Sequence, residues 1–198
     1  SFIPVLGKCC ERLMGVIIDD PSLRDRIHVF KDRFHAGEVL SEMIRRNVRL
    51  EDAILFAIPA GGVPVAYEIS KRLKLPMDLA VVRKIQIPWN PEAGFGAISW
   101  DGEIVLNKEL IRLLGLSREE VQESIQRTKN IVLERFRMFR RGKPIPDLRD
   151  KIVIIVDDGI ASGYTMLVAL RSLKKRSPEK IIIAAPTAST NAIEILEG

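Results

Sequence analysis

Two parts of the chain share one pattern of hydrophobic and polar positions. Residues 53–58 and 152–156 are continuous apolar runs of strand length, and each is followed by a glycine-containing segment and then by an amphipathic stretch. An unbroken apolar run of this length is typical of a strand that is covered on both faces, as in a parallel sheet. The pattern therefore predicts two strand–loop–helix units.

The first unit continues from the Gly61-Gly62 pair into a predicted helix. Pro64 suits the first turn of a helix, and apolar residues spaced four positions apart follow it. Pro76 ends this helix, because proline cannot continue one. Residues 79–82 are predicted to form the next strand.

The second unit repeats this plan with a loop over residues 159–163, a helix over 165–175 and a strand over 181–185. Residues 34–46 are predicted to form the first helix of the core. Repeated alternation of strands and helices implies right-handed crossovers and a mostly parallel sheet. The predicted fold class is therefore α/β, with a mostly parallel twisted sheet flanked by helices.

The segment between the two units has a different character. Residues 85–96 contain two prolines and two glycines with little periodicity, so we expect a long mobile loop there. Asp101-Gly102 joins two short apolar segments, which is a strong signal for a β-hairpin.

Two helices are predicted to follow the hairpin. Asn107 is placed to cap a short helix that ends near Leu114, and Ser117 with Glu120 forms a capping box for a helix that reaches residue 141. We expect a single domain over residues 1–198. Within it, residues 85–147 would form a hairpin lid with a helical insertion, and residues 1–31 an N-terminal extension or hood.

The composition narrows the class of protein. Hydrophobic residues make up 46% of the chain and charged residues 29%, which is ordinary for a globular protein. No apolar stretch approaches the roughly 18 residues that a membrane-spanning helix needs. The short apolar start lacks the basic residues and the cleavage site of a signal peptide. We therefore expect a cytoplasmic protein with no membrane partner.

Few residues suggest nucleophilic or metal-based catalysis. The adjacent Cys9 and Cys10 are predicted to be reduced and structural, and His28 and His35 to be packed or solvated rather than metal ligands. The formal net charge of +5 suits phosphate-rich ligands. The densest basic run is predicted to be a solvated helix face, and nucleic-acid binding is disfavoured because no aromatic residues interleave it. It comprises Arg135, Arg137, Arg140, Arg141 and Lys143.

The strongest chemical signal is an acidic pair directly after the second apolar run. In an open parallel sheet, ligands bind beyond the carboxyl ends of the strands, so Asp157 and Asp158 are predicted to face a crevice. The small residues that follow allow backbone N–H groups to approach an anion, and the next helix adds the positive end of its dipole. Ser162 and Thr165 can donate hydroxyl hydrogen bonds. Carboxylates beside an anion cradle suit a ribose 5-phosphate.

Two competing phosphate-binding motifs do not match. A Walker loop requires Gly-Lys-Ser/Thr, whereas Tyr164 and Thr165 follow Gly163 here. A dinucleotide fingerprint requires a third glycine, and Ser99 occupies that position after Gly94 and Gly96.

Residues 152–165 resemble the signature of the type I phosphoribosyltransferases. Residues 32–187 are similar to a bacterial and archaeal subgroup of that family. The resemblance implies that Asp157 and Asp158 hold the ribose hydroxyls of 5-phosphoribosyl 1-diphosphate, and that the following loop binds the 5-phosphate. The implied phosphate- and ribose-binding residues are Asp157, Asp158, Gly159, Ile160, Ala161, Ser162, Gly163, Tyr164 and Thr165.

The same resemblance implies a diphosphate loop at Ala60, Gly61 and Gly62, with a cis peptide expected between Ala60 and Gly61. Many members of the family have Arg where this chain has Ala60, which removes one cation. Arg83 and Lys84 are expected against the diphosphate, and together with the acidic pair they form the expected catalytic set. Residues 85–96 resemble the family's mobile catalytic loop, which excludes water when it closes.

The implied activity is transfer of a phosphoribosyl group to a nucleobase or related acceptor, with release of diphosphate. Mg²⁺ is the implied cofactor, held by Asp157 and Asp158 directly or through water. Ala161 occupies the position of an Asp that contacts 6-oxopurines in the family, which argues against a 6-oxopurine acceptor and leaves adenine-like, pyrimidine or non-base acceptors open. A non-catalytic regulator that binds the same donor and a sugar-phosphate phosphohydrolase remain alternatives. We expect a homodimer.

Overall fold

A four-stranded parallel sheet forms the centre of the protein. The computed structural model describes residues 5–6, 16–23 and 29–197. The sheet has the order β4 (Met77–Leu79), β3 (Ala53–Ala57), β8 (Ile152–Val156) and β9 (Lys180–Ala184). All three pairings within it are parallel. The predicted α/β fold class is confirmed.

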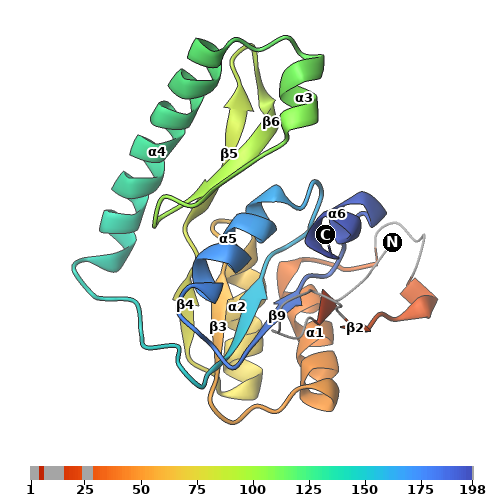
Figure 1. The fold of residues 1–198 in the computed structure, drawn as a ribbon. Coiled ribbons are helices and arrows are strands. Elements are labelled where there is room, and N and C mark those ends of the chain that lie inside the picture. The colour runs from red at the N-terminus through yellow and green to blue at the C-terminus, as the bar shows by residue number, and fades with distance from the viewer. Residues whose placement is uncertain (1–4, 7–15, 24–28, 198) are drawn as a thin grey trace.

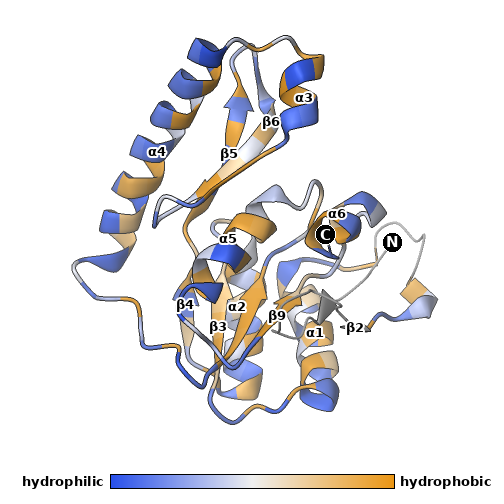
Figure 2. Ribbon diagram, in the orientation of Figure 1, coloured by the Kyte–Doolittle hydropathy of each residue, from blue (hydrophilic) through white to orange (hydrophobic). Residues whose placement is uncertain are grey.

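Hydrophobic side chains cover both faces of this sheet. In β3, Leu55 belongs to one buried cluster, which includes residues of α1 (Arg33–Asn47) and α2 (Gly62–Leu73). The neighbouring Phe56 belongs to a second cluster, which includes residues of α5 (Tyr164–Lys174) and α6 (Thr190–Glu197). Because successive side chains of a strand point to opposite faces, both faces of β3 are covered. This explains the unbroken apolar runs, which are drawn in orange in Figure 2.

A second, antiparallel sheet lies to one side of the first. It consists of β5 (Val82–Ile87), β6 (Asn90–Ser99) and β7 (Ile104–Leu106), in that order. In Figure 1 this sheet lies at the top of the view between α3 (Lys108–Leu113) and the long α4 (Arg118–Arg140). We call residues 82–140 the arm. The division of residues 1–198 into a core, an insertion at 85–147 and an extension at 1–31 stays a prediction.

Two predictions for residues in the arm and at its start are wrong. Residues 85–96 are not a loop, because β5 and β6 pair through them with register shifts around Gln86. Gly96 lies where the strands approach closely, and a Cβ atom there would overlap the carbonyl oxygen of Val105 on β7. Gly96 therefore reflects close packing between two strands and does not mark a loop.

The predicted strand over residues 79–82 is also wrong. The chain leaves the parallel sheet after Leu79 and enters the antiparallel sheet at Val82, so the apolar run spans the junction of two strands. Ala80 and Val81 are both buried at this junction. Hydrophobicity alone could not distinguish a buried connection from a strand.

The predictions for the helices and the Asp101-Gly102 hairpin are confirmed. Ser117 caps α4 through a complete capping box with Glu120, and the Asn107 side chain accepts a hydrogen bond from the Leu110 N–H at the start of α3. The basic run at the end of α4 differs from the prediction at Arg140, which is 8% exposed. Its guanidinium pairs with Asp78 on β4 and bonds to main-chain carbonyls of residues 143 and 144.

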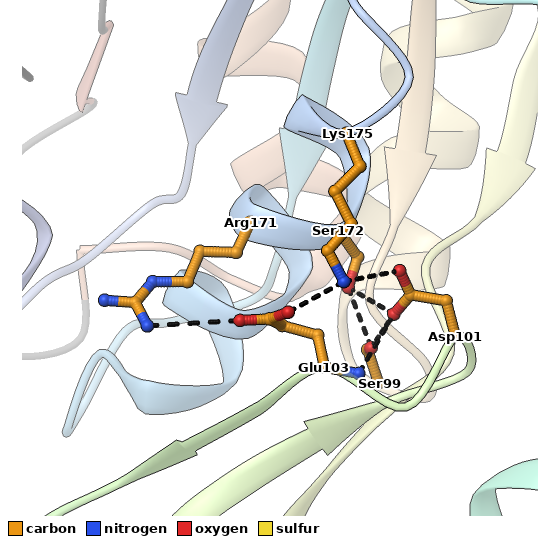
Figure 3. Close-up of polar contacts among 6 residues, drawn as sticks. All are labelled: Ser99, Asp101, Glu103, Arg171, Ser172 and Lys175. Carbon is orange, nitrogen blue, oxygen red and sulfur yellow. Dashed lines mark hydrogen bonds and ion pairs between the residues drawn. The ribbon is translucent and has the colours of Figure 1, made fainter. Parts of the chain in front are cut away.

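A polar cluster fastens the arm to α5 (Figure 3). Asp101, at the β6–β7 turn, accepts hydrogen bonds from Ser99 and from Ser172 of α5. Lys175 pairs with Asp101 at 3.1 Å and with Glu103 at 2.7 Å. Burial acts to raise the pKa of Asp101, but the hydrogen bonds outweigh it and hold that pKa at about 2.

Little of the N-terminal segment is described. It contains β1 (Val5–Leu6) paired with β2 (Val16–Ile17), and a short 3-10 helix, η1 (Pro21–Leu23). The predictions for Cys9, Cys10 and His28 lie outside the described residues. Of the two environments predicted for His35, packed or solvated, the structure shows a packed ring, which lies against Phe30 while its Nδ1 accepts a hydrogen bond from the Lys31 N–H. Across the described ranges, no helix is both long and apolar enough to cross a bilayer.

Candidate functional site

The two predicted ligand-binding loops lie side by side at the carboxyl edge of the parallel sheet. β3 and β8 are neighbours in register, and the Ile58 N–H donates to the carbonyl of Val156 at 2.9 Å. The loop after β3 therefore begins beside the loop after β8. The sequence predicted each loop separately, and the strand order places them together.

Glycine allows these loops to touch. A Cβ atom at Gly61 would overlap the carboxylate of Asp158, and one at Gly62 would lie 2.5 Å from the carbonyl oxygen of Val156. Real Cβ atoms do not approach other atoms so closely. Gly62 is therefore required as the backbone stands, whereas a side chain at Gly61 would have to displace the Asp158 carboxylate. The peptide bond between Pro59 and Ala60 is cis, one bond earlier than predicted.

The acidic pair is held in two different environments. Asp157 accepts a hydrogen bond from the Asp158 N–H at 2.8 Å, and burial raises its pKa well above the usual range. The negative charge of Asp158 raises this pKa further, whereas the hydrogen bond from the Asp158 N–H and the positive charge of Arg33 oppose the rise. Asp158 instead forms an ion pair with Arg33. The pair therefore offers one half-buried carboxyl group and one cation-bound carboxylate.

Arg33 was not among the predicted site residues. Its Nε and Nη2 atoms lie 2.8 Å and 2.7 Å from Asp158 Oδ2. Arg33 is the first residue of α1, and Asp32 caps that helix. A cation in the first turn of a helix opposes the helix dipole, which was the signal in the sequence that could have marked it.

The loop at residues 159–163, which is predicted to bind the 5-phosphate, is hydrogen-bonded to the rest of the described chain on one side only. The Ile160 N–H donates to the Thr187 carbonyl, the Ser189 N–H donates to the Ile160 carbonyl, and the Ser189 hydroxyl donates to the Ala161 carbonyl. Between residues 29 and 197, no group accepts a hydrogen bond from the backbone N–H of Ser162. Nor does any group there accept one from the N–H groups of Ala161 and Gly163.

These donors directly precede the first turn of α5, whose own N–H groups lack helical partners. The loop can therefore present several N–H groups to one anion.

The loop after β3 offers fewer donors. The Gly62 N–H already donates to the Ile58 carbonyl at 3.0 Å. The N–H groups of Ala60 and Gly61 have no partner within the described part of the chain. Within residues 60–62, two free N–H groups and no cationic side chain are therefore available to an anion.

Arg83 and Lys84 do not converge on one point. They are consecutive residues of β5, so their side chains point to opposite faces of the antiparallel sheet. Arg83 is close enough to Arg135 of α4 to feel its charge, although burial is the larger cause of the lowered pKa of Arg83. The Lys84 ammonium donates to the main-chain carbonyl of Glu92 within the hairpin.

The acidic pair can contribute to a metal site only in part. Within residues 5–6, 16–23 and 29–197, no group of three or more His, Cys, Asp or Glu side chains could hold an ion. Mg²⁺, however, is commonly held by one or two carboxylates, with the remaining ligands supplied by substrate phosphates and water. Asp157 and Asp158 fit that arrangement.

Comparison with known proteins identifies the family. The model of the phosphoribosyl transferase domain matches residues 25–192, so the chain belongs to this family. Over 171 residues the chain is 35% identical to proteins of two Mycobacterium tuberculosis strains, CDC 1551 and H37Rv, that are named provisionally as phosphoribosyl transferases. The match covers 86% of this chain but only 38% of those proteins, so the chain spans well under half of their length.

Solved structures agree on the fold. The crystal structure of TT1426 from Thermus thermophilus is similar with a TM-score of 0.66 and 34% identity, covering 84% of this chain and 79% of that one. The structure of AQ2163 from Aquifex aeolicus has a TM-score of 0.53 at 14% identity, covering 83% of this chain and 66% of that one. The second likeness concerns the fold alone.

Proposed function

We propose that the chain binds 5-phosphoribosyl 1-diphosphate at the carboxyl edge of the parallel sheet and transfers its phosphoribosyl group to a nucleobase or related acceptor. The observation that carries this proposal is the contact between the two loops. Gly61 packs on the Asp158 carboxylate, so that an anion-binding backbone, an acidic pair and a second phosphate loop share one edge. This combination suits a ligand with a phosphate at one end, hydroxyls in the middle and a diphosphate at the other end.

Each part of the site has a role in the proposal. The N–H groups of residues 161–165 bind the 5-phosphate, and Asp157 and Asp158 accept hydrogen bonds from the ribose hydroxyls. The loop at residues 60–62 receives the diphosphate through its free N–H groups. The acceptor nitrogen bonds to C1 of the ribose as the bond from C1 to the diphosphate oxygen breaks. The bonding electrons leave with diphosphate, and the acceptor proton passes to solvent.

This reaction requires positioning and electrostatic stabilisation more than a covalent intermediate. When bound, Mg²⁺ would supply Lewis-acid stabilisation of the negative charge on the departing diphosphate. Asp157 and Asp158 are the residues that would hold it, directly or through water. Their carboxyl groups also restrain the ribose so that C1 faces the acceptor.

A regulator that binds the same donor without turnover is the second candidate. Two observations favour it: the loop at residues 60–62 has no cationic side chain, and Arg83 and Lys84 point to opposite faces of β5. Because they point to opposite faces, at most one of these two cations can face a diphosphate bound at residues 60–62. The expected homodimer stays a prediction, and sedimentation velocity would measure it.

A turnover assay separates the candidates. The protein is incubated with 5-phosphoribosyl 1-diphosphate, Mg²⁺ and a panel of purines, pyrimidines and simple amines, and release of diphosphate is followed. Release that depends on the acceptor supports the transferase, and release without any acceptor indicates a hydrolase. Tight binding without release supports the regulator, and absence of binding contradicts the proposed function as a whole.

A further inference from the structure

Arg33 stands out among the charged residues near the acidic pair. Its side chain is 58% exposed, yet two of its nitrogens lie within 2.8 Å of the same oxygen of Asp158. The two residues are 125 positions apart in the chain. The fold therefore brings this cation to the site from an element that carries no other predicted ligand-binding residue.

The position of Arg33 in its helix is unfavourable on local grounds. The first turn of α1 contains no acidic residue, so Arg33 faces the positive end of the helix dipole without a local partner. The helix has its cap without it, because Asp32 accepts the hydrogen bond from the His35 N–H at 2.8 Å. Helix formation thus does not require an arginine here, and the partner of Arg33 is across the site.

Arg33 also lies beside the loop that has no cation. The Asp158 carboxylate is in contact with Gly61 on one side and with the Arg33 guanidinium on another. The same oxygen, Asp158 Oδ2, contacts the Gly61 backbone and the Arg33 guanidinium, so Arg33 lies close to residues 60–62. An anion bound to that loop would therefore lie within reach of the guanidinium.

We infer that Arg33 is the cation that receives the diphosphate of the incoming ligand. In the structure the Arg33 guanidinium is paired with the Asp158 carboxylate. When the ligand enters, the guanidinium exchanges Asp158 for diphosphate oxygens, and Asp158 becomes free to accept a ribose hydroxyl. This inference rests on the proposed function and assigns a partner to one end of the ligand.

Two physical points support such an exchange. An ion pair with this much exposure is weak, so releasing Asp158 costs little. The planar fork of the guanidinium matches two phosphate oxygens, whereas both of its contacts here converge on one carboxylate oxygen. Diphosphate therefore offers Arg33 a better partner than the one it has.

The test uses inorganic diphosphate with Mg²⁺ and isothermal titration calorimetry. Arg33→Met is expected to weaken diphosphate binding by about tenfold to a hundredfold, the range for loss of a charge-assisted hydrogen bond. Arg33→Lys should lie between wild type and Arg33→Met, because it keeps the charge but loses the fork. Ribose 5-phosphate, which has no diphosphate, should bind all three with nearly equal affinity.

A matched control removes the effect of net charge. Lys31 is an exposed cation two residues away. Lys31→Met removes the same single positive charge but leaves Arg33 in place. The inference therefore predicts nearly wild-type diphosphate affinity for this variant. A loss equal to that of Arg33→Met would show that only the overall field matters and would overturn the inference.

A second background separates direct contact from an indirect effect. If Arg33 contacts diphosphate, Arg33→Met should weaken binding in Asp158→Asn protein as well. If Arg33 acts only by neutralising Asp158, the loss will vanish in that background and the inference fails. Unchanged diphosphate affinity of Arg33→Met, with normal binding of 5-phosphoribosyl 1-diphosphate, overturns the inference alone. Failure of the wild type to bind either ligand overturns the proposed function as well.

Discussion

Replacing Gly61 by alanine tests the contact between the two loops. A Cβ atom at this position would overlap the Asp158 carboxylate, which is a side chain that can rotate away. Gly61 has φ −63° and ψ −36°, a conformation that alanine adopts without strain. Gly61→Ala should therefore displace Asp158 from its place while leaving the backbone intact.

The effect on stability should be small. Loss of the ion pair between Asp158 and Arg33 costs about 0.2–1 kcal/mol, the usual range for an exposed pair. Alanine at an unstrained position regains about 0.4–1 kcal/mol by restricting the unfolded chain. The two contributions nearly cancel, so the Tm should move by less than about 4 °C.

The effect on binding should be large by comparison. A charge-assisted hydrogen bond from a ribose hydroxyl to Asp158 is worth about 1.5–3 kcal/mol. Its loss should weaken binding of 5-phosphoribosyl 1-diphosphate by roughly tenfold to a hundredfold, measured by titration calorimetry. Wild-type affinity in Gly61→Ala would refute the reasoning, because it would mean that Asp158 can move without consequence for the ligand.

Gly62→Ala is the matched comparison. Its Cβ atom would lie 2.5 Å from the Val156 carbonyl oxygen and 3.0 Å from the Asp157 Cα, so the overlap is with backbone that cannot rotate away. Overpacking of this kind costs about 1–3 kcal/mol. Gly62→Ala should therefore lower the Tm clearly, whereas Gly61→Ala should not. Equal shifts in the two variants would contradict the distinction.

Two further predictions concern the arm. The pKa of Asp101 is about 2 in the folded protein and below its unfolded value, so its contribution to stability is complete above about pH 4 and is lost as the pH falls toward 2. Asp101→Asn should lower the free energy of unfolding at pH 7 by about 1 kcal/mol after allowance for solvent screening, and should flatten its decline between pH 4 and 2; an unchanged decline in urea titrations would argue against this role. Arg140→Met should cost about 3–5 kcal/mol, because it leaves Asp78 without its buried partner, and a cost below 1 kcal/mol would show that the pair is not structural.

Much of the fold could be predicted because its signals are local. The apolar runs at residues 53–58 and 152–156 appear as β3 and β8, and the capping residues Asn107 and Ser117 mark the starts of α3 and α4. Such signals depend on residues a few positions apart. They survive in the folded protein because tertiary packing agrees with them.

The errors arose where a residue's meaning depends on distant contacts. In the sequence Gly96 indicated a loop, whereas in the structure it lies in close contact with β7. Arg140 indicated a solvated helix face, whereas in the structure it pairs with Asp78. The split between β4 and β5 has no local signal, because the connection is as apolar as the strands that it joins. Only the pairing of β4 in the parallel sheet and of β5 in the antiparallel sheet shows that the apolar run is divided between two strands.

The candidate site divides in the same way. The acidic pair and both glycine loops are contiguous motifs, and the sequence predicted their positions. Arg33 reaches Asp158 from 125 residues away, and only the packed helices bring the two together. The orientation of Arg83 and Lys84 likewise depends on how β5 pairs with β6.

The most direct test of the central claim is binding of 5-phosphoribosyl 1-diphosphate in the presence of Mg²⁺, measured by titration calorimetry on two variants. In one, Asp157 and Asp158 are both changed to Asn; in the other, Asp147, an exposed carboxylate paired with Arg149, is changed to Asn. The account predicts wild-type affinity for Asp147→Asn, and no measurable binding for the double variant despite an unchanged circular dichroism spectrum. Equal affinity of the double variant and wild type would contradict the assignment of the site.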